Sequence, residues 1–185
     1  MRRDRRKGPT LNWYDTVFAL INMRSFSNLW YWIVLAIVWS MAGQRVLGVP
    51  WDMILRARKT EGDEVMADVS ALLRIHVTRR LRIVQESGAV LAGLAAFVLT
   101  SLVLLAFVYG VEFAQAVFLL VVPFIPVTAL SLRTARAIRD RDLDGLALVK
   151  AVQRLRLHIQ LIGLASIFVT ALWGMYHNMT TNVFG

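Results

Sequence analysis

The chain has 185 residues, of which 57% are hydrophobic, and its mean hydropathy of +0.57 is too high for a soluble domain of this size. It contains no cysteine, which excludes disulfides, cysteine nucleophiles and metal or iron–sulfur sites that use thiolate ligands. The net charge of +9 comes mainly from arginine-rich segments between apolar runs, which indicates topology signals and headgroup contacts and not a nucleic-acid surface.

Four apolar runs have about the 20 residues that a helix needs to cross the hydrocarbon core of a bilayer. They predict membrane helices at about residues 28–47, 88–109, 113–132 and 157–177. We therefore expect an all-α, polytopic membrane protein that forms a single helical domain over residues 1–185.

The first of these runs, 28–47, leaves its topology open. It follows an amphipathic segment at 11–24 and a strongly basic N-terminus. If the run crosses the membrane, which we favour, Trp30 and Trp32 lie at one interface and Trp51 at the other, and the basic N-terminus is translocated. The alternative is a re-entrant or interfacial hairpin that keeps both ends on the cytoplasmic side.

Two helical links, 52–86 and 133–156, are predicted to continue into the membrane helices that follow them. Apolar residues recur in both at helical spacing, at Val69, Leu73, Val77 and Leu81 and again at Leu148, Val152, Leu155 and Ile159. Only residues 110–112 join the second and third membrane helices, so these form a hairpin and both links lie on one side.

The positive-inside rule places that side in the cytoplasm and the C-terminus in the periplasm. The links then form a basic face that we expect to bind anionic lipid headgroups or an acidic partner. Its candidate residues are Arg74, Arg79, Arg80, Arg82, Arg133, Arg136, Arg154 and Arg156.

Helix packing is predicted at two places in the membrane. Ala89, Gly93 and Ala96 form a stripe of small residues that lets another helix approach closely. Pro123 and Pro126 remove backbone donors and are expected to kink the third membrane helix.

The interiors of the last three apolar runs contain no ionisable residue of the kind that pumps and ion-coupled transporters need. Glu112, at the hairpin turn, is interpreted as an interfacial turn residue and not as a coupling carboxylate. We interpret His76, His158 and His177 as solvated or lipid-facing and not as haem or metal ligands. No catalytic motif is present, so we expect neither an enzyme nor a cofactor.

Four stretches carry a resemblance that covers most of the chain: WYDTVFALINMRSFSNLWYWIVLAIVW, RVLGVPWDM, FVYGVEFAQAVFLLVVPF and LSLRTAR. They are similar to a family of small inner-membrane proteins from alphaproteobacteria of the Rhodobacter group. Members of that family bear the description of a component of the SufBCD iron–sulfur assembly complex, which implies a link to cluster assembly. SufB, SufC and SufD are soluble proteins of a different type, and this chain has no cysteine ligand or ATPase motif, so no site residue carries over.

These observations predict a non-catalytic accessory subunit or assembly factor of a respiratory or photosynthetic membrane complex, with integral membrane subunits and anionic lipids as its partners. Two alternatives stay open. One is an oligomeric channel or small-solute transporter whose path is lined by the kink at Pro123 and Pro126. The other is a membrane anchor for the Suf machinery.

Overall fold

The computed structural model describes residues 26, 29–59 and 63–183, and these are almost entirely helical. The elements in chain order are α2 (Leu29–Gln44), β1 (Arg45–Val46), β2 (Val49–Pro50), α3 (Trp51–Lys59), α4 (Asp63–Val103), the π-helical turn η2 (Leu104–Val108), α5 (Glu112–Val121), α6 (Phe124–Asp140) and α7 (Gly145–Val183). Three spans are long and apolar enough to cross a membrane, namely Glu64–Val108, Glu112–Asp140 and Gly145–Thr180, and α2 is a shorter apolar helix. The predicted all-α, polytopic membrane fold is confirmed.

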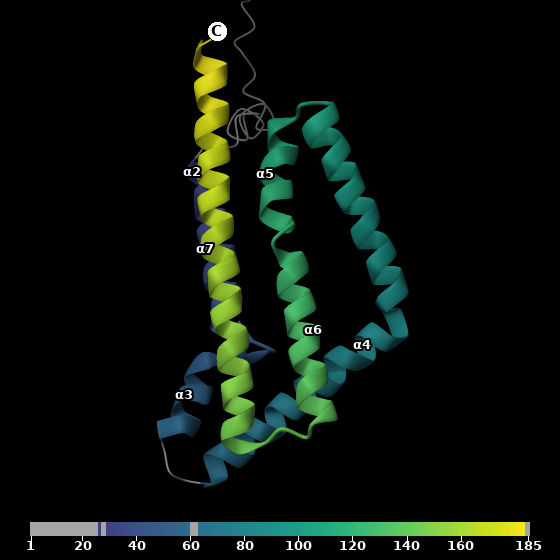
Figure 1. The fold of residues 1–185 in the computed structure, drawn as a ribbon, viewed down its shortest axis with the longest axis vertical. Coiled ribbons are helices and arrows are strands. Elements are labelled where there is room, and N and C mark those ends of the chain that lie inside the picture. Colours follow the sequence, from purple (N-terminus) through teal and green to yellow (C-terminus); the bar gives the residue numbers. More distant parts are fainter. Residues whose placement is uncertain (1–25, 27–28, 60–62, 184–185) are drawn as a thin grey trace, which may run out of the picture.

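The helices stand side by side between two distinct ends (Figure 1). At one end lie α3, the first part of α4, the foot of α6 and the start of α7, and we call this the basic end. The opposite end carries the turn between η2 and α5 and the end of α7, and we call it the far end. Both predicted links therefore lie at the same end of the bundle, as the hairpin requires.

Helix α4 bends near its middle and has two limbs of different character (Figure 1). Its amphipathic limb, residues 63–86, runs across the foot of α6, and its apolar limb, residues 88–103, rises beside α5 and α6. The amphipathic limb continues into the apolar limb as predicted, because the helix is unbroken over 41 residues. The change of direction was not foreseen.

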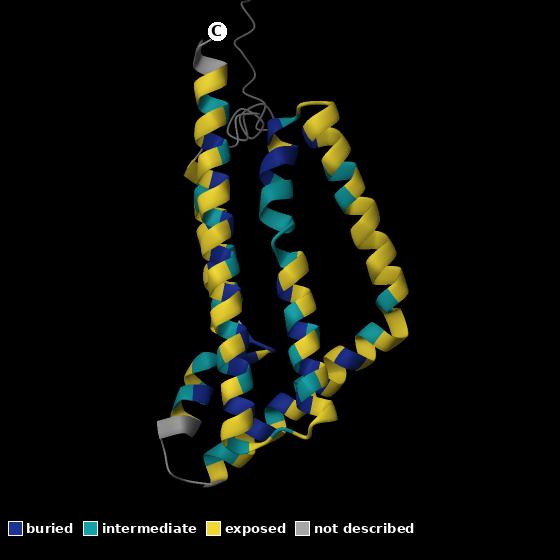
Figure 2. Ribbon diagram, viewed as in Figure 1, coloured by how far each residue is buried: buried dark blue, intermediate teal, exposed yellow. Residues whose placement is uncertain are grey.

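The hydrophobic core is concentrated at the basic end, as the dark blue segments of Figure 2 show. The stripe on the amphipathic limb is buried as predicted, with Val69 and Leu73 0% exposed. It packs in one cluster with buried residues of the other elements there, namely Ile54, Ala135, Ile138, Leu148, Val152 and Leu155. Apolar contact stabilises most where it removes surface from water, so the packed core belongs at the end outside the hydrocarbon.

Several predicted boundaries need correction. Helix α2 ends at Gln44, before the predicted 47, because Arg45–Pro50 folds back as the β1–β2 ribbon through Leu47 and Gly48, at φ 54° and 91°. The predicted link 133–156 consists of the ends of two long helices, since α6 continues to Asp140 and only the Arg141–Asp144 turn separates it from α7. The predicted amphipathic segment 11–24 lies outside the described residues.

At the proline pair, where a kink was predicted, the third predicted membrane helix is divided into two helices. Helix α5 ends at Val121 and α6 begins at Phe124, with Val122 and Pro123 between them. Neither Pro123 nor Pro126 has an N–H for the helical ladder, and the Ile125 N–H instead donates to the Val122 carbonyl at 3.0 Å. The break changes the direction of the helix without interrupting the apolar span.

Candidate functional site

The predicted basic face is assembled at one end of the bundle from α4, α6 and α7. Seven of its eight arginines are exposed, and the eighth, Arg156, is half-buried. The Arg156 guanidinium lies 4.0 Å from the centre of the Trp51 ring, a cation–π contact that joins α7 to α3. Arg156 is therefore a packing residue as well as a charged one.

Two of the exposed arginines form ion pairs. Arg74 contacts Asp142 at 2.8 Å and Asp144 at 3.7 Å, which ties the amphipathic limb to the α6–α7 turn. Arg82 pairs with Glu86 one helical turn away, at 2.8 Å. The backbone N–H of Gly145 donates to Asp144 at 2.8 Å and, together with the charge of Arg74, lowers the pKa of that carboxyl below its ordinary value.

The other five exposed arginines form no ion pair within the described part of the chain. They are Arg79, Arg80, Arg133, Arg136 and Arg154. Five unpaired guanidinium groups at one end of the bundle produce a positive potential there. Phosphate and carboxylate groups are the partners that such groups bind best.

The predicted stripe of small residues is exposed in the part of the chain that the structure describes. Ala89, Gly93 and Ala96 are exposed, and a Cβ on Gly93 would meet no atom within 4 Å. At about 100° per residue, this stripe lies on the opposite side of the helix from Leu91 and Ala95, which face α6. The stripe is thus free for a helix of another protein or another copy.

Close packing inside the chain uses different small residues, on α7, which the sequence analysis missed. A Cβ on Gly163 would lie 2.6 Å from Trp39 Cε3, and a Cβ on Gly174 would lie 3.3 Å from Phe26. Ser166 and Thr170, between them, are also buried. Gly163 of α7 meets Trp39 of α2, and the later Gly174 meets Phe26, which precedes α2, so the two helices run in opposite directions.

A buried polar cluster at the far end is the second finding that the sequence did not predict. Glu112, only 9% exposed, accepts a hydrogen bond from the Phe26 N–H at 2.8 Å, and its other oxygen lies 3.7 Å from His177 Nδ1. Gln115 donates to the Ala106 carbonyl at 2.9 Å. The cluster therefore connects Phe26, which precedes α2, with η2, α5 and the end of α7.

These contacts give Glu112 a structural role. Its carboxylate sits in the first turn of α5, where the helix dipole favours negative charge. Gln115 satisfies a carbonyl that the chain leaves free as it exits η2, and its own oxygen accepts from Trp173 Nε1 at 3.1 Å. The signal that was available in the sequence is a Glu and a Gln on one helix face in an otherwise apolar run.

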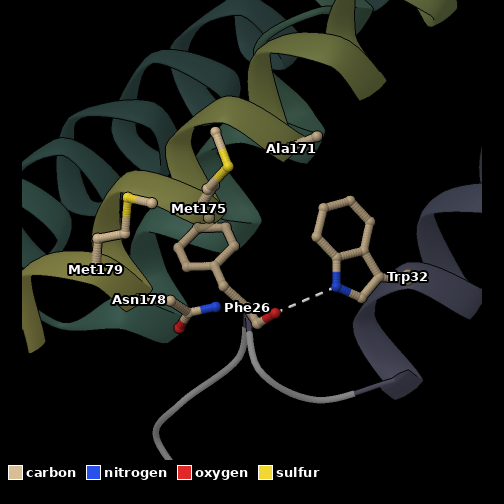
Figure 3. Close-up of a pocket in the computed structure, with 7 residues that line it drawn as sticks. Phe26, Trp32, Ala171, Met175, Asn178 and Met179 are labelled. Atoms are coloured by element: carbon tan, nitrogen blue, oxygen red, sulfur yellow. Dashed lines mark hydrogen bonds between the residues drawn. The ribbon is translucent and has the colours of Figure 1, made fainter. Parts of the chain in front are cut away.

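A shallow cavity of about 560 Å³ lies beside this cluster (Figure 3). Phe26 and Trp32 face Met175 and Met179 of α7 across it, and Trp32 Nε1 donates to the Phe26 carbonyl at 3.2 Å. The lining is mostly aromatic and thioether, with Asn178 as its one polar side chain, and the seven described residues that form it include no nucleophile or titratable group.

The histidines are separated. His76 packs beneath the Gly48 turn, where a Cβ would lie 2.9 Å from His76 Nδ1. His158 is exposed, and its Nδ1 lies 2.6 Å from the Arg154 carbonyl. Within the described ranges, no three His, Asp or Glu side chains gather in a group that could hold a metal ion.

Comparison with known proteins gives no relative from which a role could be read. No family of known proteins, no curated protein and no solved structure matches the chain.

Proposed function

We propose that the protein is a non-catalytic accessory subunit or assembly factor of a larger complex in the bacterial inner membrane, with a respiratory or photosynthetic complex as the partner. It acts by packing against the helices of integral membrane subunits. Its basic end faces the cytoplasm and its C-terminus the periplasm.

The apolar limb of α4 is the observation that carries this proposal. Every residue from Ala89 to Val98 is exposed, and the most apolar window of its span is only 6% buried inside the chain (Figure 2). Lipid tails are as apolar as leucine, so helices associate in a bilayer through close packing at small residues. Ala89, Gly93 and Ala96 supply such a surface, turned away from the rest of the chain.

The basic end supports the orientation. Arginine is concentrated in segments that stay in the cytoplasm, and the link residues lie together at that end. The amphipathic limb, which runs across the bundle with its apolar stripe buried, suits a position at the headgroup level. Each basic residue near an anionic surface contributes about 1 kcal/mol of attraction, so the five unpaired arginines stabilise this placement.

The experiment that tests the function is purification of the tagged full chain from its native membrane in mild detergent, followed by mass spectrometry. We expect stoichiometric recovery of integral membrane subunits with the wild-type chain. Gly93→Leu fills the exposed small-residue surface at a position where an added Cβ meets no described atom within 4 Å, so it should lose these subunits. Ala95→Leu, on the opposite side of the same limb, is the matched control and should keep them.

Two results would contradict the proposal. A pure homo-oligomer that carries solute flux in liposomes would favour the channel or transporter alternative. Stoichiometric Suf proteins in the eluate would favour the membrane anchor for cluster assembly.

A further inference from the structure

An apolar groove separates the apolar limb of α4 from the α5–α6 span. Its volume is about 660 Å³, and it is lined by six residues between Leu91 and Leu99 and six between Val121 and Leu132. Thr128 is the one hydroxyl-bearing residue among the twelve. Protein interiors have few voids larger than a water molecule, so a groove of this size in a bilayer is filled by something apolar.

The groove cannot close, because the two helices are fixed to each other beyond both of its ends. At the far end, Gln115 binds the Ala106 carbonyl, and the rings of Phe107 and Phe118 meet edge to face at 5.4 Å between centres. At the basic end, buried Leu81 of the amphipathic limb belongs to the same core as Ala135 of α6. Between these contacts the helices diverge (Figure 1), and small residues leave the space open.

The length of the groove identifies its occupant. Residues 91–99 of α4 rise about 12 Å and residues 121–132 about 16 Å at 1.5 Å per residue. Half of the hydrocarbon core is about 15 Å, the thickness of one leaflet. A membrane-spanning helix of a partner needs the full thickness, whereas the groove ends before the far end, where Phe107 and Phe118 are in contact. A single acyl chain of the leaflet at the basic end fits.

The charge at the end of the groove selects the headgroup. Ile125, Ala129 and Leu132 line the groove on one stripe of α6, and Arg136 continues that stripe one turn beyond Leu132. Arg133 lies one turn beyond Ala129. Both guanidinium groups are exposed and form no ion pair within the described part of the chain. A phosphate at this level is within the reach of two donors that bind it in fork geometry.

We propose that the groove is a binding site for one anionic phospholipid, with an acyl chain between α4 and α6 and its phosphate at Arg133 and Arg136. The site is independent of the partner surface at Gly93, which lies on the other side of α4. The lipid completes the packing that the chain itself leaves open between α4 and α6.

Native mass spectrometry of the delipidated full chain in micelles tests this proposal, with phosphatidylglycerol and phosphatidylethanolamine of identical acyl chains as probes. We expect one tightly retained phosphatidylglycerol and weaker retention of phosphatidylethanolamine. Arg136→Gln should weaken phosphatidylglycerol about fivefold, the factor that corresponds to roughly 1 kcal/mol per basic residue. Lys150→Gln, at an exposed basic residue of α7 that neither lines the groove nor belongs to the eight arginines of the basic face, should change neither lipid.

A second pair of variants tests the acyl chain. Ala95→Phe fills the groove and should abolish retention of both lipids, whereas Ala96→Phe, its neighbour on the stripe that faces away, should leave retention intact. Equal lipid loss in both variants, or in neither, would mean unspecific annular lipid and overturn the site. So would equal affinity for the two headgroups, or disulfide cross-linking of Ala95→Cys between two copies, which would place protein in the groove.

Discussion

Gly163 is the residue at which the packing of α2 against α7 is most tightly determined. A Cβ at this position would lie 2.6 Å from Trp39 Cε3 and 3.0 Å from Cδ2, closer than non-bonded carbon atoms approach. The movement of the indole is restricted, because it also stacks on Phe124 at 5.1 Å between ring centres and 14° between planes. Gly163→Ala must therefore separate the two helices or displace the ring.

The size of the effect follows from a comparison with Gly93. Both glycines lie inside long helices, so alanine brings each the same gain in helix propensity, about 0.5–1 kcal/mol. At Gly93 nothing lies within 4 Å of the new methyl group, and only the gain remains. At Gly163 the overpacking costs about 1–3 kcal/mol. We expect Gly163→Ala to be less stable than Gly93→Ala by about 1–3 kcal/mol.

Reversible unfolding of the purified chain in mixed micelles, followed by tryptophan fluorescence, measures this difference. The Gly163→Ala chain should also show altered near-ultraviolet circular dichroism, because the environment of Trp39 changes. Equal free energies of unfolding for the two variants would refute the close contact between α2 and α7.

Three further predictions concern polar contacts and the ribbon. Glu112→Leu removes the acceptor of the buried Phe26 N–H and should lower the free energy of unfolding by about 1.5–3 kcal/mol. Glu112→Gln keeps an acceptor oxygen and should lower the free energy of unfolding by less. Equal decreases for the two variants would contradict the hydrogen bond. Gly48 has φ 91°, and the Cβ of Gly48→Ala would lie 2.9 Å from His76 Nδ1, so this variant should lower the free energy of unfolding by about 1–3 kcal/mol. In a double-mutant cycle, His76→Ala should reduce that loss of stability, and strictly additive effects would exclude the clash. The folded-state pKa of Asp144 lies below its ordinary value of 3.8, so its carboxylate stabilises the fold above pH 3.8, and this contribution is lost as the pH falls through the folded-state pKa. Asp144→Asn should therefore reduce the dependence of the free energy of unfolding on pH in the acid range. An unchanged pH dependence would be inconsistent with the contacts of Asp144 to Gly145 and Arg74.

Local features of the sequence predicted most of the fold. The apolar stripes at Val69–Leu81 and Leu148–Ile159 were predictable, because apolar residues at helical spacing indicate which side of a helix is buried. The break at Pro123 follows from a missing donor, and the hairpin follows from the short turn at Gly110, which adopts φ 67°. Each of these features depends on neighbours a few residues away.

Contacts between distant segments were not predictable in the same way. Many small residues lie in the apolar runs, and only the register between α2 and α7 makes Gly163 the one that meets Trp39. Glu112 reads as a turn residue in sequence, and its burial depends on Phe26, 86 positions earlier, and on His177. The sequence predicted that the basic links lie at the same end, because a hairpin of two membrane helices separates them. The ion pairs of Arg74, in contrast, depend on the position of the α6–α7 turn.

We propose that the helices cross the inner membrane with the basic end in the cytoplasm. The chain has no cysteine, so single introduced cysteines report without background from the protein itself. Tyr109→Cys, at a position 74% exposed at the far end, should react with a membrane-impermeant maleimide in intact cells. Arg141→Cys, in the turn between α6 and α7, should react only after the inner membrane is permeabilised. Labelling of Arg141→Cys and not Tyr109→Cys in intact cells, or of both positions, would contradict a cytoplasmic basic end.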